Sequence, residues 1–274
     1  MGTHAEPAEQ AAATDRRLAC VASGSRTSGD VPGVALIHGF AQTGACFGPF
    51  GAAIEAEHPV LRVDQPGHGG SLRHLQAALP QGAELLMETV GRAVLVGYSM
   101  GARLALHAAL SHPHQVPGLV LIGGTAGIED ANERAARREE DESRAQRLEA
   151  VGLPSFLEEW LAMPMFAGLP TWARFDEERR RNTVEGLAAS LRRAGTGSMT
   201  PLWDRLGELQ CPVLCVTGAQ DERYGRFAER LVAEVPGPAR HVVVEGAGHS
   251  AHLEQPEAAA DAVLGFLREL PVAP

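Results

Sequence analysis

The chain has 274 residues, of which 45% are hydrophobic and 21% are charged, a composition typical of a globular enzyme and not of a disordered protein. Its formal net charge of −10 argues against nucleic acid as a partner. No apolar run reaches the roughly 18 residues that a membrane helix needs, and the start of the chain lacks a basic head followed by an apolar stretch. We therefore expect no membrane partner and no signal peptide, and we predict a disordered tail at 1–17.

Strand-like and helix-like segments alternate along the rest of the chain. Short apolar runs predict strands at 19–22, 34–38, 59–63, 93–98, 118–122, 212–217 and 240–245. Helical patterns lie between them at 71–88, 101–112, 224–234 and 255–269. This alternation predicts an α/β fold, in which helices cover both faces of a mostly parallel, twisted sheet.

One long segment, 126–208, interrupts the alternation because it contains no strand pattern. It predicts several helices instead, at 131–150, 153–163, 171–181 and 185–193. We therefore divide the chain into a core, formed by 18–125 and 209–270, and an inserted helical lid. The lid is expected to cover the carboxyl edge of the sheet.

The strand at 93–98 runs into Gly97-Tyr-Ser-Met-Gly101, and a helical pattern follows directly. A serine at such a tight strand-to-helix turn is typical of a nucleophile elbow, where a strained backbone projects the hydroxyl above the sheet. The flanking glycines fit this reading, because the strand and helix backbones pass too close there for side chains. The pentapeptide also arises by chance in ordinary turns, so Ser99 is a candidate nucleophile whose partners must be found elsewhere.

Two further polar residues follow predicted strands. Asp221 lies in the loop after the strand at 212–217, and His249 lies in a glycine loop after the strand at 240–245. Each lies beyond the carboxyl end of its strand, where open α/β sheets build their sites. The order serine, acid, histidine predicts the α/β-hydrolase fold, in which His249 takes the proton of Ser99 and Asp221 holds the other imidazole N–H.

The strand at 34–38 ends in His38-Gly39-Phe40, where this fold places a loop that donates to an oxyanion. We predict that the backbone N–H groups of Phe40 and Met100 form the oxyanion hole. We interpret His38 as a residue that hydrogen-bonds the loop in place and not as a catalytic group.

The chain gives no sign of a metal site or of structural disulfides. Its four cysteines, which lack metal-ligand spacing, are Cys20, Cys46, Cys211 and Cys215. We interpret them as small buried hydrophobic residues in a reducing cytoplasm, where we expect the protein to reside. His249 and His252 form an H-x-x-H pattern, but no third ligand is evident, so we predict no metal.

All 24 basic residues are arginine. Arg103 lies one helical turn after Ser99, close to the site, where a charge is costly to bury without an anion. Other arginines lie on the predicted lid, at 134, 137 and 138 and at 179–181. We expect most of these to be solvated and paired with Glu139, Glu140 and Glu178, and one or two to point inward as carboxylate clamps.

Several runs together resemble one family of α/β hydrolases, the 2-succinyl-6-hydroxy-2,4-cyclohexadiene-1-carboxylate synthases of menaquinone biosynthesis. These runs are 36–40, 64–69, 95–106, 186–191, 195–203 and 247–254, and the resemblance extends from about residue 33 to 268. The family resemblance implies a lyase that needs no cofactor. Its triad acts as a base that removes a ring proton, and pyruvate leaves from an enolpyruvyl-cyclohexene carboxylate.

The resemblance also implies roles for single residues. By it, Arg103 binds a substrate carboxylate, Arg137 clamps the substrate from the first lid helix, and Trp160 packs against it. It implies three further substrate-binding residues, which are Tyr98, Arg179 and Arg223. Tyr98 would offer its hydroxyl beside the nucleophile. The expected partner is a small polycarboxylate substrate, and the expected state is a monomer or a small homo-oligomer.

Two positions depart from the family pattern. Ala102 stands where a second glycine is common after the elbow, and Gln65 replaces the aliphatic residue usual in D-x-P-G-H-G. Both leave room for another carboxylated substrate. The main alternative is therefore a serine carboxylesterase or C–C bond hydrolase that works through an acyl-enzyme. A non-catalytic binding module is disfavoured because every triad position is filled, and Ser99 disfavours a dehalogenase or epoxide hydrolase because those enzymes use aspartate there.

Overall fold

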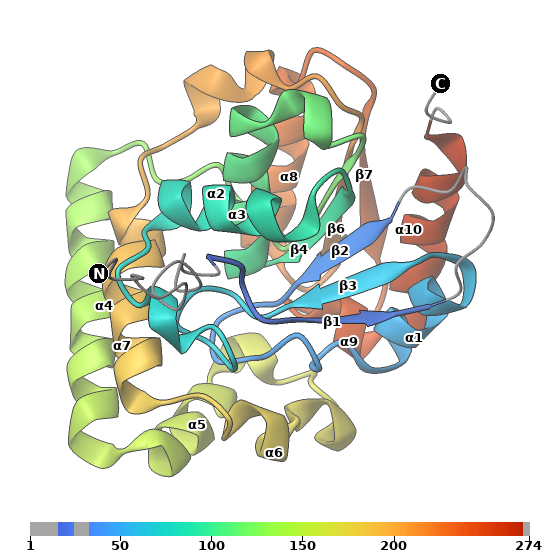
Figure 1. Cartoon of the computed structure of the whole chain (residues 1–274). Coiled ribbons are helices and arrows are strands. Elements are labelled where there is room, and N and C mark those ends of the chain that lie inside the picture. The colour runs from blue at the N-terminus through green and yellow to red at the C-terminus, as the bar shows by residue number, and fades with distance from the viewer. Residues whose placement is uncertain (1–15, 25–32, 271–274) are drawn as a thin grey trace, which may run out of the picture.

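Seven strands form one sheet in the part of the chain that this computed structural model describes, residues 16–24 and 33–270 (Figure 1). The predicted tail at 1–17 lies almost wholly outside these residues. The strands are β1 (Cys20–Ser23), β2 (Val34–Ile37), β3 (Val60–Val63), β4 (Val94–Tyr98), β5 (Leu119–Ile122), β6 (Val213–Gly218) and β7 (Ala239–Val244). Each begins and ends within one residue of a predicted strand, so the sequence pattern located the sheet correctly.

The strands lie in the order β1-β3-β2-β4-β5-β6-β7, and every neighbouring pair is parallel except β1 with β3. Strands β2, β4 and β5 are buried at every residue, as expected for the centre of a sheet that is covered on both faces. Edge strand β1 exposes Val21 and Cys20. The expectation of four buried cysteines is therefore wrong for Cys20, because an edge strand has no neighbour to cover it.

Two helical layers cover the sheet (Figure 1). One contains α2 (Leu79–Val90), α3 (Met100–Ser111) and α8 (Glu222–Glu234), and the other contains α1 (Gly48–Glu57), α9 (Ala251–Glu254) and α10 (Pro256–Glu269). Each layer packs its apolar side chains on one face of the strands and so forms a separate hydrophobic core. The fold is the predicted α/β arrangement of parallel strands between helices.

Two predicted helices differ from the structure. The segment 71–88 contains only the short 3-10 turn η1 (Leu72–His74) before α2 begins at Leu79, because Pro80 starts a helix well but cannot lie inside one. The predicted lid helix at 171–181 is divided at Phe175, whose φ of 49° is left-handed. It becomes η4 (Thr171–Arg174) and α6 (Asp176–Arg179).

A helical segment is inserted between β5 and β6. Besides α6, it contains α4 (Ala131–Val151), α5 (Leu153–Leu161) and α7 (Val184–Ala194). Helices α4 and α7 pack side by side, and Arg192 of α7 pairs with both Glu142 and Glu149 of α4. Apolar residues of α4, α5 and α7 form a third core with Phe40 and Met100, which holds this segment against the strand ends that carry the elbow.

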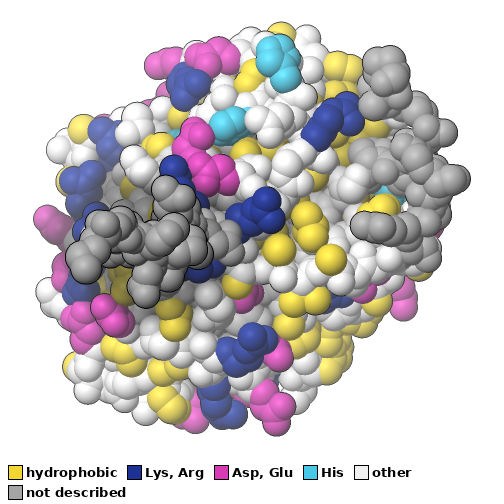
Figure 2. All heavy atoms as spheres, in the orientation of Figure 1, with side chains coloured by type: hydrophobic (Ala, Val, Ile, Leu, Met, Phe, Trp, Pro, Cys, Tyr) yellow, Lys and Arg dark blue, Asp and Glu magenta, His cyan; other side chains and the backbone are white. Residues whose placement is uncertain are grey.

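Arginine and acidic side chains are interspersed on the face shown in Figure 2. Many arginine side chains of the described residues form ion pairs. Arg230 pairs with both Glu129 and Glu234, for example, and Arg147 pairs with Glu159. Within residues 16–24 and 33–270, no helix is long and apolar enough to span a membrane.

Candidate active site

Ser99 lies between the end of β4 and the start of α3, with a φ of 52° and a ψ of −106°. Such a backbone is strained for a residue with a side chain and occurs mainly at functional positions. Both flanking glycines are required because neighbouring backbone atoms leave no room for a side chain. A Cβ on Gly97 would lie 2.4 Å from the carbonyl oxygen of Gly101, and one on Gly101 would lie 2.1 Å from that of Ile37. The turn is therefore a nucleophile elbow.

The structure brings Ser99, His249 and Asp221 together from three different loops. His249 Nε2 lies 3.0 Å from Ser99 Oγ, and His249 Nδ1 lies 2.6 Å from Asp221 Oδ2. His249 is almost fully buried, and Asp221 stands at the N-cap of α8, where it also accepts a bond from the N–H of Tyr224 at 3.4 Å. In this geometry the imidazole can accept the serine proton while the carboxylate fixes its tautomer.

The two predicted oxyanion donors lie at the same end of the sheet. Met100 is the first residue of α3, so its N–H has no acceptor within the helix and lies at the positive end of the helix dipole. Phe40 follows β2, and both residues line the cavity that contains Ser99. The arrangement can place two backbone donors beside a developing oxyanion.

His38 holds the Phe40 loop in place, in agreement with the interpretation of the sequence. Its Nε2 accepts a bond from the Gln65 N–H at 3.0 Å, and its Nδ1 lies 2.7 Å from the Gly39 carbonyl oxygen. Burial lowers the pKa of His38 to about 4, so the ring is neutral. The Gln65 amide donates to the His38 carbonyl, which gives this unusual residue a structural role.

A cavity of about 300 Å³ lies above the elbow, between the core and the inserted helices. Its wall contains every predicted site residue: Ser99, Asp221, His249, Phe40, Met100, Tyr98, Arg103, Arg137, Trp160, Arg179 and Arg223. The sequence therefore named residues that the fold gathers around one space, although they come from both the core and the insertion.

Two of the cavity arginines are buried without a carboxylate partner. Arg103 donates to the Ala194 carbonyl at 2.6 Å, and Arg179 donates to the Arg174 and Ala41 carbonyls at 2.6 and 3.0 Å. Burial lowers the pKa of Arg103 to about 10 and lowers that of Arg179 as well. Across residues 16–24 and 33–270, neither guanidinium forms an ion pair. The cavity wall therefore holds positive charge that an anion would stabilise.

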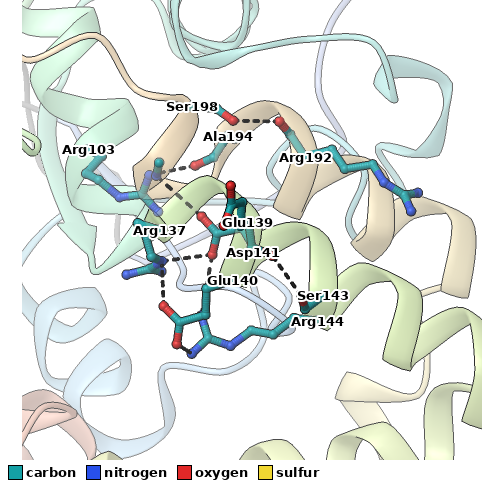
Figure 3. Close-up of polar contacts among 11 residues, drawn as sticks. Arg103, Arg137, Glu139, Glu140, Asp141, Ser143, Arg144, Arg192, Ala194 and Ser198 are labelled. Atoms are coloured by element: carbon teal, nitrogen blue, oxygen red, sulfur yellow. Dashed lines mark hydrogen bonds and ion pairs between the residues drawn. The ribbon is translucent and has the colours of Figure 1, made fainter. Parts of the chain in front are cut away.

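Arg137, in contrast, is already paired (Figure 3). Its Nε lies 2.9 Å from Asp141 Oδ1, and Asp141 is buried. Burial by itself would lower the pKa of Arg137, but the Asp141 carboxylate outweighs it and raises that pKa. Arg223 is exposed at the rim, with its guanidinium carbon 5.9 Å from the centre of the Phe227 ring.

The aromatic residues of the wall differ in what they offer. The Tyr98 side chain lines the cavity, and its buried hydroxyl is bonded to Ser250 Oγ at 2.7 Å, which positions the loop of His249. That this hydroxyl also meets a substrate stays a prediction. Burial raises the pKa of Tyr98 far above its usual range. The Trp160 ring lies 5.1 Å from that of Phe40, and its buried indole N–H has no partner among the described residues.

The other arginines that the sequence analysis named in the inserted segment do not line the cavity. Arg134 donates to the carbonyls of Ile128 and Glu129, and Arg138 donates to that of Gly197. Arg181 pairs with Glu178, as expected for a solvated helix face, and Arg180 is exposed.

Among the cavity residues that the sequence analysis did not assign to the site are Glu140, Asp141, Arg144 and Tyr224. The first three follow Arg137 by three, four and seven positions, a helical spacing that could have placed them on its face of α4. Among the described residues, no group of three or more histidine, cysteine, aspartate and glutamate side chains could hold a metal ion.

Comparison with known proteins agrees with this geometry. The model of the alpha/beta hydrolase family matches residues 34–262. A 2-succinyl-6-hydroxy-2,4-cyclohexadiene-1-carboxylate synthase of Enterobacter sp. (strain 638) is 32% identical over 244 residues, which cover 86% of this chain and 92% of the relative. The synthase of Serratia proteamaculans (strain 568) is also 32% identical, over 77% of this chain and 84% of its own.

A solved structure, that of MenH from S. aureus, superposes with a TM-score of 0.84 at 26% identity and covers 91% of this chain and 98% of that one. The fold, the elbow and the family match together define an enzyme of the α/β-hydrolase class. Within that class, the chain belongs to the family of 2-succinyl-6-hydroxy-2,4-cyclohexadiene-1-carboxylate synthases.

Proposed function

We propose that this protein is a lyase that eliminates pyruvate from an enolpyruvyl-cyclohexene carboxylate, the reaction that the names of its relatives imply in menaquinone biosynthesis. One observation supports this above all. Two buried arginines that form no ion pair with any described residue, Arg103 and Arg179, line the same cavity as the Ser99 triad. Substrate carboxylates would offset the cost of burying these charges, whereas a neutral ester has no group that could do so.

The proposed chemistry uses the triad as a base. His249 Nε2 draws the proton from Ser99 Oγ, and the oxygen of Ser99 removes the ring proton next to the succinyl carbonyl. The electron pair of that C–H bond forms a double bond between C2 and C3, and the existing ring double bond shifts from C3–C4 to C4–C5. The bond from C5 to the enolpyruvyl oxygen then breaks, and pyruvate leaves as its enolate. The proton returns from His249 to the enolate, so the enzyme ends unchanged and needs no cofactor.

The remaining wall residues bind and orient the substrate. Asp221 stabilises the imidazolium while His249 holds the proton, and the N–H groups of Phe40 and Met100 stabilise the charge that develops on the succinyl carbonyl oxygen. Arg103 and Arg179 bind carboxylates, and Arg137 assists from α4. The buried indole N–H of Trp160 provides a further donor, for which the protein itself has no acceptor among the described residues.

A serine carboxylesterase or C–C bond hydrolase is the second candidate, because a serine 3.0 Å from its histidine, beside two backbone donors, also suits an acyl-enzyme. In that case Ser99 Oγ attacks a carbonyl carbon and the oxyanion donors stabilise a tetrahedral intermediate. The two candidates share the same triad and differ in which substrate atom Ser99 meets.

The deciding experiment is a pyruvate-release assay, coupled to lactate dehydrogenase, on 2-succinyl-5-enolpyruvyl-6-hydroxy-3-cyclohexene-1-carboxylate. The same preparation is tested in parallel on p-nitrophenyl acetate, with Ser99→Ala as the control for both substrates. We expect the anionic substrate to turn over far faster than the ester. Fast ester hydrolysis with an acyl-enzyme burst, and no pyruvate, would instead establish the hydrolase.

A further inference from the structure

The face of α4 that is turned to the cavity carries four charged side chains, Arg137, Glu140, Asp141 and Arg144 (Figure 3). Their spacing places all four on one side of the helix, one turn apart. Arg144 also approaches the substrate wall, because its guanidinium carbon lies 5.9 Å from the centre of the Trp160 ring. The inserted helix therefore contributes two cations to the cavity, not one.

The two carboxylates of this face have different surroundings. Only 1% of the Asp141 side chain is exposed, and it accepts bonds from Arg137 Nε at 2.9 Å, Arg144 Nη1 at 3.4 Å and the Gly197 N–H at 3.3 Å. Asp141 is therefore a fixed anchor that ties both arginines to the loop after α7. These contacts hold both arginines at the cavity wall in the protein without ligand.

Glu140 contacts the same two arginines, but it is 52% exposed. It forms an ion pair with Arg144 Nη2, and its other oxygen lies 3.6 Å from Arg137 Nε. A carboxylate thus bridges two arginines at the edge of the cavity, which is the arrangement that a substrate carboxylate would adopt. Exposed pairs of this kind contribute little to stability, so Glu140 can be displaced at small cost.

We propose that Arg137 and Arg144 form a carboxylate-binding subsite, which Glu140 fills in the empty protein and yields to a carboxylate of the ligand. Glu140 thereby competes with the ligand and tunes its affinity, while Arg144 is a specificity-determining residue. The inference rests on the proposed function only in that the ligand carries carboxylates. Two positive charges against one fixed negative charge, that of Asp141, leave the subsite with a net charge that a single carboxylate neutralises.

Equilibrium binding tests the subsite without any turnover. The probe is 2-succinylbenzoate, a stable aromatic dicarboxylate with a ring carboxylate and a succinyl arm, titrated calorimetrically into the full-length protein. Glu140→Gln should tighten binding about two- to fivefold, the value of a displaced exposed ion pair. Arg144→Gln should weaken it at least about fivefold, and Arg144→Lys should weaken it less. In the double variant the gain from Glu140→Gln should disappear, because there is no longer a second arginine to release.

Two variants on the same helix control for net charge. Glu139→Gln removes one negative charge from α4, as Glu140→Gln does, and Arg147→Gln removes one positive charge, as Arg144→Gln does. Neither Glu139 nor Arg147 lines the cavity. Both should bind the probe as the unsubstituted protein does. Melting temperatures show that each variant is folded, which is expected because Glu140 and Arg144 are partly exposed.

The inference is overturned if Arg144→Gln binds like the unsubstituted protein, if Glu140→Gln binds less tightly, if the control variants change as much, or if the unsubstituted protein does not bind the probe. A protein that binds as expected yet releases no pyruvate would contradict the proposed function alone. Pyruvate release by a protein whose Arg144 variants bind normally would contradict the subsite alone.

Discussion

Replacing Arg103 separates a substrate ligand from a structural residue. Burial lowers its pKa from 12.5 to about 10, which corresponds to about 3 kcal/mol of lost stability for the charged form in the empty cavity. The Arg103→Met variant removes this cost, keeps most of the volume, and loses one bond to the Ala194 carbonyl, worth about 1 kcal/mol. We therefore expect the melting temperature of the variant to stay unchanged or to rise.

The kcat/KM of the Arg103→Met variant should fall, although its melting temperature does not. If a substrate carboxylate binds Arg103, the loss of that contact costs about 2–5 kcal/mol, or roughly thirty- to several-thousandfold in kcat/KM of pyruvate release. Arg103→Lys should recover part of this, because an ammonium cannot form the bidentate contact. Arg147→Met, which removes an exposed arginine paired with Glu159, is the control and should change neither quantity. A variant Arg103→Met that melts much earlier but retains its kcat/KM would identify Arg103 as a structural residue.

The triad should behave as one unit. Ser99→Ala and His249→Ala should each lose most of the pyruvate-release rate, with little further loss in the double variant. Asp221→Asn should lose about as much, because the amide favours the wrong imidazole tautomer. Near-normal turnover of Asp221→Asn would point to Glu222 or Glu245 as the acid. Acid should destabilise the protein through its buried histidines. Burial lowers the pKa of His38 to about 4 and that of His252 to about 3, so the unfolded chain takes up protons below about pH 6.5 that the folded chain does not. Stability is then complete above about pH 7 and is lost as the pH falls toward 4, by about 2 kcal/mol per histidine at about pH 5. His252→Leu should reduce that loss in thermal melts, since neither ring nitrogen of His252 has a partner among the described residues; an unchanged pH profile would contradict this account.

Much of the fold could be read from the sequence because strand and turn signals were strong. Most strands are short apolar runs ended by glycine or a polar residue, and such runs are buried wherever helices cover both faces. The ends of the helices were harder to predict than the strands. The 71–88 prediction overlooked Pro80, which marks a helix start, and α1 was missed although Pro49 opens it in the same way.

Site residues that belong to sequence motifs could be predicted. Contacts that arise only when distant segments pack together could not. Ser99, Asp221 and His249 stand in recognisable loops, so their meeting follows from the parallel order of the strands. The contact of Tyr98 with Ser250 joins residues 152 positions apart, and no local pattern indicates it. Glu140 and Arg144 lie on a helix rich in charge, where the residues that face the cavity can be told from the solvated ones only once α7 is in place.

The absence of lysine from the chain has a consequence for how the cavity responds to its surroundings. An arginine whose pKa falls to about 10 remains protonated at any pH at which a cell lives. A lysine lowered by the same amount would lose its proton near about pH 8 and would become a nucleophile able to condense with keto acids. Arginines alone give the cavity a constant charge and no reactive amine. Pyruvate, the product of the proposed reaction, would therefore not be trapped there as an imine.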